Sequence, residues 1–148
     1  MSCKDLFNLD FGKTITGVIK KLSKKEDELM SVYGLTHFHA RYIMNIHRFE
    51  SITMTDLTEL AGVDKANTTR VVKDLLEKDV VVKSGGERKF FLNLTEKGRK
   101  IAEFFKEHIE NFLKRVFKDF KASEVETLTL LLEKLFHGTK NALEGEGC

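Results

Sequence analysis

Polar and cationic side chains suited to hydrogen-bond recognition are concentrated between residues 53 and 89. The densest run is Lys65-Ala-Asn-Thr-Thr-Arg-Val-Val-Lys73. An Asn amide pairs with adenine, Lys and Arg bond to guanine, and a Thr methyl contacts the thymine methyl. Thr hydroxyls and the free N–H groups of a helix start suit phosphate oxygens. The candidate DNA-binding residues are Thr53, Thr55, Lys65, Asn67, Thr68, Thr69, Arg70, Lys73, Arg88 and Lys89.

Two predicted helices position the central run. A short helix begins after Thr53 or Thr55, either of which is a suitable N-cap, and ends at Gly62. Asp64 then caps the next helix, which contains the run itself. Its polar residues are expected on the outer side and in the exposed first turn. Its core-facing residues are expected to be Val71, Val72, Leu75 and Leu76.

Behind this helix the hydrophobic pattern changes from helical to extended. Residues 80–83 and 89–94 are short runs rich in β-branched and aromatic residues, and the sequence 84–87 between them is typical of a turn. This pattern predicts a β-hairpin. Arg88 and Lys89 follow the turn, where cations can contact phosphates or the minor groove. The alternative is that they are solvated or structural charges of the hairpin.

Two helices are predicted before the central unit. Apolar residues at helical spacing run from Ile15 to Val32 and predict a long first helix that ends near Gly34. Thr36 is a suitable N-cap for the second helix, which has an apolar face of its own.

Two further helices are predicted after the hairpin. Thr95 caps the first of them, and its apolar stripe extends from Ile101 to Phe120. Ser123-Glu-Val-Glu126 has the spacing of a capping box and opens the last helix. The predicted fold class is therefore mainly α (α+β). The central order of short helix, tight turn, second helix and hairpin is that of a winged helix-turn-helix.

The composition argues against several other classes of protein. The chain has 148 residues, enough for one compact domain, and its 41% hydrophobic and 32% charged residues are ordinary for a soluble protein. Cys3 and Cys148 fit neither a disulfide framework nor a zinc site and favour a reducing cytoplasm. We see no signal peptide, membrane span, phosphate-binding loop or catalytic motif. We expect a cytoplasmic protein with no cofactor, no metal and no enzymatic activity.

Charge is distributed unevenly along the chain. Residues 26–64 carry seven acidic and two basic side chains, whereas residues 65–89 carry seven basic and four acidic ones. The last 27 residues have five Glu and two Lys. A basic segment between acidic ones is consistent with a surface that binds a polyanion, and also with an ordinary solvated surface.

Four segments, in this order and spacing, resemble the MarR family of transcription regulators. They are Gly34-Leu-Thr36, Thr55-Asp-Leu-Thr-Glu-Leu-Ala61, Val63-Asp-Lys-Ala-Asn-Thr-Thr-Arg-Val-Val-Lys-Asp-Leu75 and Leu94-Thr-Glu-Lys-Gly-Arg99. The resemblance implies a single domain over residues 1–148, with a winged helix-turn-helix unit at 35–98. It also implies long dimerisation helices at 1–34 and 99–148, and a homodimer that binds a pseudo-palindromic operator in double-stranded DNA.

Apolar residues at both ends of the chain fit such a dimer. They exceed what a small winged unit needs for its own core, although an ordinary intramolecular core is the alternative. These residues are Phe7, Leu9, Phe11, Leu131, Leu135 and Phe136.

The family resemblance further implies a repressor that a small phenolic or aromatic carboxylate effector releases from DNA. The effector pocket would lie between the dimerisation helices and the winged unit, with Lys13, His37 and Arg41 as the candidate ligand-binding residues. The alternative is that His37 belongs to an exposed helix start and binds nothing. The wing departs from the family pattern, because Gly86 stands where an Asp usually pairs with the Arg corresponding to Arg88.

Two other functions fit the same sequence. The chain can be a winged-helix module that binds proteins without binding DNA, since fold does not dictate function. It can also be a regulator that senses oxidants through Cys3 or Cys148.

Overall fold

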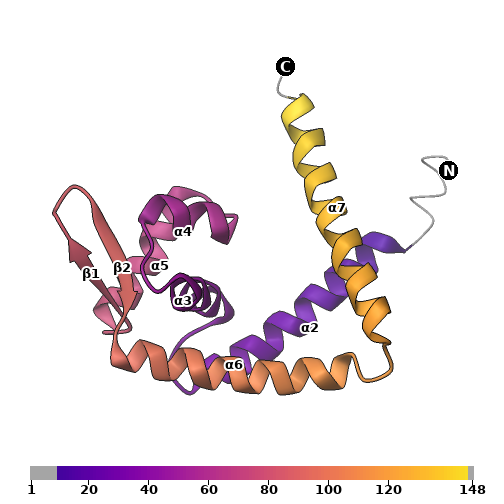
Figure 1. Ribbon diagram of the computed structural model, residues 1–148, viewed down its shortest axis with the longest axis horizontal. Coiled ribbons are helices and arrows are strands. Elements are labelled where there is room, and N and C mark those ends of the chain that lie inside the picture. The colour runs from indigo at the N-terminus through magenta and orange to yellow at the C-terminus, as the bar shows by residue number, and fades with distance from the viewer. Residues whose placement is uncertain (1–9, 147–148) are drawn as a thin grey trace. The chain divides into compact units, whose positions relative to one another are not determined.

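The computed structural model describes residues 10–146 and confirms the predicted order of elements (Figure 1). The elements in chain order are α2 (Phe11–Ser31), α3 (His37–Phe49), α4 (Met54–Ala61), α5 (Lys65–Glu77), β1 (Val81–Gly85), β2 (Phe90–Leu94), α6 (Glu96–Val116) and α7 (Ala122–Glu146). The chain divides into two compact units, one ending at Ile109 and the other beginning at Glu110, so that α6 contributes to both. The fold is mainly α with one antiparallel hairpin, as predicted.

The first unit is built around one hydrophobic core. Fully buried side chains come from α2, α3, α4, α5, the hairpin and the first half of α6. Burying each large apolar side chain contributes roughly 1.5–3 kcal/mol, so this shared core is what holds the short elements together. The largest of these side chains are Met30, Ile43, Ile46, Leu57, Leu75, Leu92 and Ile101.

Local chemistry sets the ends of α4 and α5. The Thr53 hydroxyl accepts the Asp56 backbone N–H (3.2 Å), which caps α4 as expected. Gly62 ends α4 in the left-handed conformation (φ 66°). The Asp64 carboxylate accepts the Asn67 backbone N–H (2.7 Å) and starts α5. These caps fix the tight turn between the two helices.

The hairpin turn lies two residues later than predicted. β1 continues through Gly85, which pairs with Phe90 and has a φ of +98°, a conformation that favours glycine. The Gly86 N–H donates to the Lys89 carbonyl (3.0 Å) and closes the turn. Arg88 therefore lies within the turn rather than after it.

The helix predicted to reach Phe120 ends earlier, at Val116. The apolar stripe continues beyond the helix because Phe117 and Phe120 pack edge to face, with their ring centroids 5.1 Å apart. An apolar period therefore does not by itself mark where the helix ends.

The cap of the last helix also differs from the prediction. The helix begins at Ala122, so Ser123 lies inside it and is not the N-cap. The Lys121 backbone N–H donates to the Glu124 carboxylate (3.3 Å). The reach-back carboxylate of a capping box lies three residues after the cap, and Glu124 has that spacing from Lys121.

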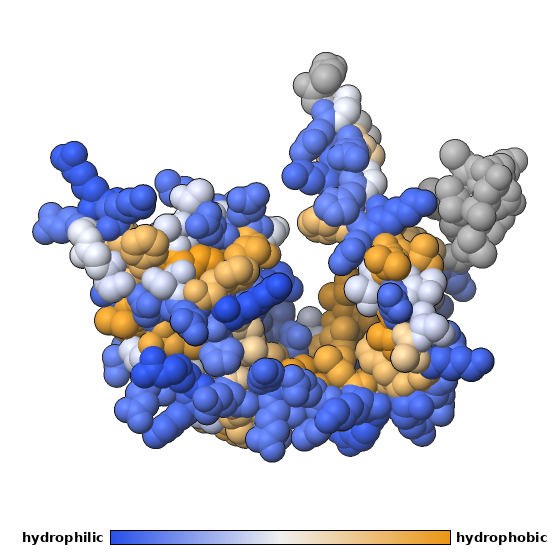
Figure 2. Space-filling model, viewed as in Figure 1, coloured by the Kyte–Doolittle hydropathy of each residue, from blue (hydrophilic) through white to orange (hydrophobic). Residues whose placement is uncertain are grey.

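Helix α7 has an uncovered apolar side. None of the side chains from 122 to 145 is buried, and Figure 2 shows apolar side chains at the surface of this helix. The exposed large hydrophobic residues are Leu128, Leu130, Leu131, Leu132, Leu135, Phe136 and Leu143. Within residues 10–146, none of the helices is both long and apolar enough to cross a membrane.

Candidate nucleic-acid interface

Helix α5 presents to solvent four of the six predicted DNA-binding residues that it contains. The opposite side of the helix, with Val72 and Leu75, is buried in the core, which fixes the rotation of α5. The exposed residues are Lys65, Thr69, Arg70 and Lys73, and Asn67 is half-buried beside them.

The prediction that Thr68 contacts DNA from the exposed side of α5 is wrong, because Thr68 is fully buried. Thr68 lies four residues before Val72 and therefore shares its core-facing side. Its hydroxyl donates to the Asp64 carbonyl (3.2 Å) and lies 3.2 Å from the Tyr42 hydroxyl of α3. Thr68 thus joins α5 to α3 and is not available to a DNA partner.

A ladder of polar contacts runs along the exposed first turns of α5. Asp64 accepts both the backbone N–H and the side-chain amide of Asn67, at 2.7 and 3.0 Å. The side-chain oxygen Oδ1 of Asn67 in turn accepts a hydrogen bond from the Arg70 guanidinium. Residues three apart are neighbours on a helix, so each contact supports the next. The ladder orients Arg70 on the outer face before any partner binds, and Asn67 must exchange these contacts to pair with a base.

The wing and α4 supply the remaining predicted contacts. Arg88 and Lys89 are exposed in the hairpin turn, and Thr55 is exposed on α4. Within the described residues 10–146 no ion pair involves Arg88, and Gly86 has no carboxylate to offer it. Arg88 therefore carries its charge at the wing tip.

Asn93 is a wing residue that the sequence analysis missed. Its side-chain amide donates to the Glu50 carbonyl (3.0 Å), and its Oδ1 accepts from the Ser84 hydroxyl (2.7 Å). The first bond attaches the hairpin to the loop between α3 and α4, and the second links β2 to β1. Only a contact over 43 residues reveals this role, so no local pattern predicts it.

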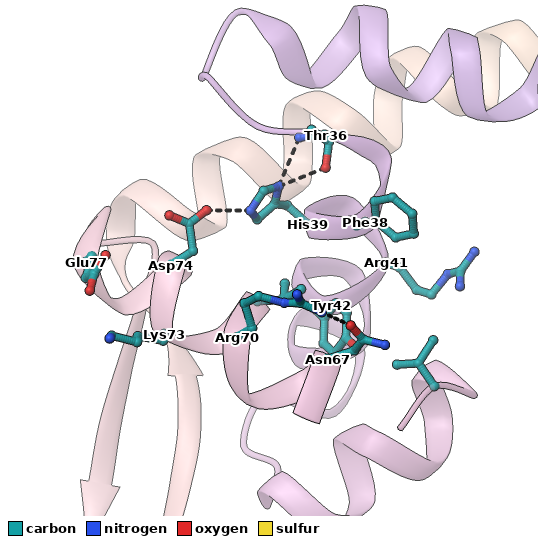
Figure 3. Close-up of a pocket in the computed structure, with 12 residues that line it drawn as sticks. Thr36, Phe38, His39, Arg41, Tyr42, Asn67, Arg70, Lys73, Asp74 and Glu77 are labelled. Atoms are coloured by element: carbon teal, nitrogen blue, oxygen red, sulfur yellow. Dashed lines mark hydrogen bonds and ion pairs between the residues drawn. The ribbon is translucent and has the colours of Figure 1, made fainter. Parts of the chain in front are cut away.

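A cavity of about 690 Å³ lies between α3 and α5, inside the winged unit (Figure 3). Its apolar lining includes Phe38, Val63 and Val71. Its charged lining comprises Arg41, Arg70, Lys73, Asp74 and Glu77. The cavity therefore combines an apolar wall with guanidinium groups, one of which belongs to the exposed face of α5.

The three predicted ligand-binding residues do not share one cavity. Arg41 lines the α3–α5 cavity, whereas His37 lines a shallow depression against α2. Lys13 is exposed near the start of α2 and lines neither of these two cavities. Lys13 precedes Asp27, the partner of His37, by fourteen residues, which is about 21 Å along an α-helix.

His37 joins α3 to α2 through Asp27. The His37 backbone N–H donates to Asp27 Oδ1 (2.7 Å), and the His37 Nδ1 lies 2.9 Å from the same oxygen. The hydrogen bond from the His37 backbone lowers the pKa of Asp27. Burial raises the pKa of the neighbouring Glu26, although electrostatic interactions with His37 and Arg41 oppose that rise.

His39 is a further residue of the α3–α5 region that the sequence analysis did not select. Its ring lies between Thr36 and Asp74, with Nε2 2.6 Å from Asp74 Oδ2 and Nδ1 3.0 Å from the Thr36 backbone nitrogen (Figure 3). The sequence Thr36-x-x-His39 could have indicated the contact with Thr36, because it has the spacing of a capping box with His in the position of Glu or Gln.

Several predictions fall outside the described residues. These are the redox role of Cys3 or Cys148 and the dimer contacts of Phe7 and Leu9. Phe11 is described, and it is exposed.

Comparison with known proteins agrees with the geometry. Residues 33–89 match the model of the MarR family. The chain is similar to the HTH-type transcriptional regulator SarZ of Staphylococcus epidermidis, with 27% identity over 125 residues and 82% of each chain covered. It is also similar to the regulator SarZ of Staphylococcus aureus, with 29% identity over 115 residues, covering 76% of this chain and 75% of the relative.

Solved structures share the fold. A MarR transcriptional regulator from Methanosarcina mazei superposes with a TM-score of 0.78 at 23% identity, covering 91% of this chain and 93% of that chain. A mutant of E. coli MarR in complex with operator DNA superposes with a TM-score of 0.76 at 24% identity, covering 91% of this chain and 99% of that chain. The winged helix-turn-helix architecture expected from the sequence is therefore confirmed.

Proposed function

We propose that this chain, whose residues 33–89 match the model of the MarR family, is a homodimeric transcription regulator of that family and binds a pseudo-palindromic operator in double-stranded DNA. The observation that carries the proposal is the outward side of α5, where Arg70 is held at the surface by Asn67 and Asp64. The solved complex of E. coli MarR with operator DNA, and the regulators named among the relatives, support the same function.

In this proposal the start of α5 enters the major groove. Lys65, Thr69 and Arg70 reach base edges and adjacent phosphates, and Asn67 joins them after exchanging its intramolecular contacts. The wing carries Arg88 to the neighbouring backbone or minor groove. Two copies related by a twofold axis then read half-sites about one helical turn apart, roughly 10 base pairs.

Selection from random duplex DNA followed by fluorescence anisotropy tests this function. Arg70→Ala should weaken binding to the selected duplex by about 10- to 100-fold and relax base preference, since a good bidentate contact is worth about 1–3 kcal/mol. The matched control is Lys100→Ala, which removes an exposed cation of α6. The affinity of the wild-type protein should fall steeply with salt, because phosphate contacts release counterions.

An affinity that is flat between low and moderate salt, or an unchanged affinity of Arg70→Ala, contradicts the DNA-binding proposal. The second result would favour the alternative of a winged-helix module that binds proteins.

We further propose that the regulator is a repressor and that a small aromatic carboxylate releases it from DNA. The α3–α5 cavity supports this, because Phe38 and Tyr42 offer ring contacts and Arg41 offers a guanidinium for a carboxylate. Arg70 and Asn67 line the same cavity. A ligand that binds Arg70 in the cavity removes this side chain from the DNA-facing side of α5. Ligand binding would in this way weaken DNA binding.

Titration with benzoate and salicylate tests the effector proposal. Each acid should bind the free protein and weaken its DNA binding, and Arg41→Ala should weaken acid binding by about tenfold, the effect of losing one charge-assisted contact of about 1.4 kcal/mol. Lys13→Ala is the control, since Lys13 does not line this cavity. If Arg41→Ala binds the acids as tightly as wild type, the effector does not occupy this cavity.

A further inference from the structure

We propose that His39 and Asp74 form a positioning pair that holds the DNA-reading helix α5 against α3 while the His39 ring is neutral. The pair is defined by the geometry of the two helices (Figure 3). Its effect on DNA affinity rests on the function proposed above.

The His39 ring makes a directional contact at each of its nitrogens. Nε2 lies 2.6 Å from Asp74 Oδ2 on α5, and Nδ1 lies 3.0 Å from both the backbone nitrogen and the hydroxyl of Thr36. The His39 side chain is only 14% exposed, whereas that of Asp74 is 39% exposed. The ring thus connects the start of α3 to the C-terminal half of α5.

These contacts select one protonation state. The Thr36 backbone N–H can only donate, so Nδ1 must present its lone pair. The ring proton then lies on Nε2 and is donated to the Asp74 carboxylate. A second proton would occupy Nδ1, facing the Thr36 N–H, and would abolish the hydrogen bond that caps α3.

The pair adds orientation to a helix that is otherwise held by apolar packing. Val72 and Leu75 are buried, but apolar contact is not directional. The Tyr42–Thr68 hydroxyl contact is one polar link between α3 and α5. Asp74 lies six residues, about 9 Å, further along α5, so two separated links resist both rotation and tilt.

The charged groups around the ring are mixed. Arg41 of α3 and the side chains of Arg70, Lys73 and Glu77 of α5 line the same cavity as the His39 ring. Lys78 approaches the other Asp74 oxygen at 3.9 Å. The Asp74 carboxylate favours a charged His39 ring, whereas the Thr36 N–H and the cations Arg41, Arg70 and Lys73 disfavour it. The neutral ring satisfies both partners at once, because it donates to Asp74 and accepts from the Thr36 N–H.

Rescue by an amide side chain tests the pair through DNA binding. In His39→Gln the amide oxygen can accept from Thr36 and the amide nitrogen can donate to Asp74, whereas His39→Leu can do neither. Operator affinity should fall about tenfold in His39→Leu, because the hydrogen bonds at both ring nitrogens are lost, and should stay near that of wild type in His39→Gln. His47→Gln, on the same helix, is the control and should follow wild type.

Two measurements that need no DNA complete the test. Long-range ¹H–¹⁵N NMR of the histidine rings at pH 7.5 should show His39 protonated at Nε2 only. In urea unfolding, His39→Leu and Asp74→Ala should each lower the midpoint, and the double variant should lower it no further than either single one.

Equal operator affinities of His39→Leu and His39→Gln, a proton on Nδ1, or additive midpoint losses would each overturn the positioning pair. If the wild type binds no duplex, the proposed function fails instead, and the NMR and unfolding measurements still decide whether the pair exists.

Discussion

Glu26 and Asp27 are adjacent carboxylates of α2 whose pKa values shift in opposite directions. Asp27 accepts the backbone N–H of His37, a bond that stabilises the charged form and lowers its pKa. Glu26 is withdrawn from water by burial, which disfavours the charged form and raises its pKa. Neighbours in sequence thus acquire different electrostatic roles from the helix face on which each lies.

The two shifts predict opposite effects on stability. The lowered pKa of Asp27 stabilises the fold above the unfolded-state value near 4, and this contribution is lost as the pH falls through the folded-state pKa. The ionised form of Glu26 costs stability above its raised pKa, and the cost disappears below it. At pH 7, Asp27→Asn should therefore destabilise the protein and Glu26→Gln should stabilise it, each by less than about 1 kcal/mol, because water screens partly exposed charges.

Urea unfolding at pH 7 and at pH 3 measures both effects. The differences from wild type should shrink at pH 3, where Glu26 is protonated and part of the Asp27 contribution is lost. If both variants shift the midpoint in the same direction at pH 7, the assignment of opposite roles is wrong.

At the scale of elements, the start of α6 is docked closely on the corner between α5 and β1. The Thr95 hydroxyl donates to the Asp79 carbonyl (2.7 Å) and accepts the Gly98 N–H (3.0 Å). A Cβ at Gly98 would lie 2.1 Å from the Val80 carbonyl oxygen. This glycine is thus needed for close approach of two backbones, while its φ is not in the left-handed region.

We expect Gly98→Ala to destabilise the protein by about 2–3 kcal/mol, because either α6 or β1 must move to relieve the overlap. Gly86→Ala is the matched control: its Cβ would meet its nearest neighbour, the Lys89 carbonyl, at an ordinary 3.7 Å. That variant should stay within about 0.5 kcal/mol of wild type in urea unfolding at fixed protein concentration. Equal stability of the two alanine variants would contradict the close docking.

At the scale of the whole molecule, the apolar side of α7 has no partner within its own compact unit. Leu131 is 57% and Phe136 66% exposed. Contiguous apolar surface of this kind marks an interaction site in soluble proteins. The proposed homodimer supplies the partner, since a second copy brings the same apolar helix to a twofold axis.

Leu131→Glu should therefore convert the dimer to a monomer at about 10 μM, because it places charges in the apolar contact. Sedimentation velocity measures the mass, and circular dichroism should show helix content close to that of wild type. Operator affinity should fall at least about 100-fold as the two half-sites are no longer bound together. Glu133→Gln is the control on the same helix, and a dimeric Leu131→Glu variant would contradict the proposed contact.

Local sequence determined the type and order of the elements. Caps such as Thr53 and Asp64, the left-handed Gly62 and the change of hydrophobic period act within a few residues, so they can be read directly from the chain. The same local rules selected the polar side of α5. Thr68 was assigned to the wrong side because its residue type is polar, although its spacing of four residues from Val72 places it on the core-facing side.

Only the tertiary structure decided which distant residues meet. The contact of His39 with Asp74 spans 35 residues, and that of Asn93 with Glu50 spans 43. The same packing placed His37 and Arg41 in the linings of different cavities and brought Arg41 together with Arg70 around one of them. Helix periodicity states which side of a helix is buried, but the neighbour that covers it depends on how all the apolar surfaces pack at once.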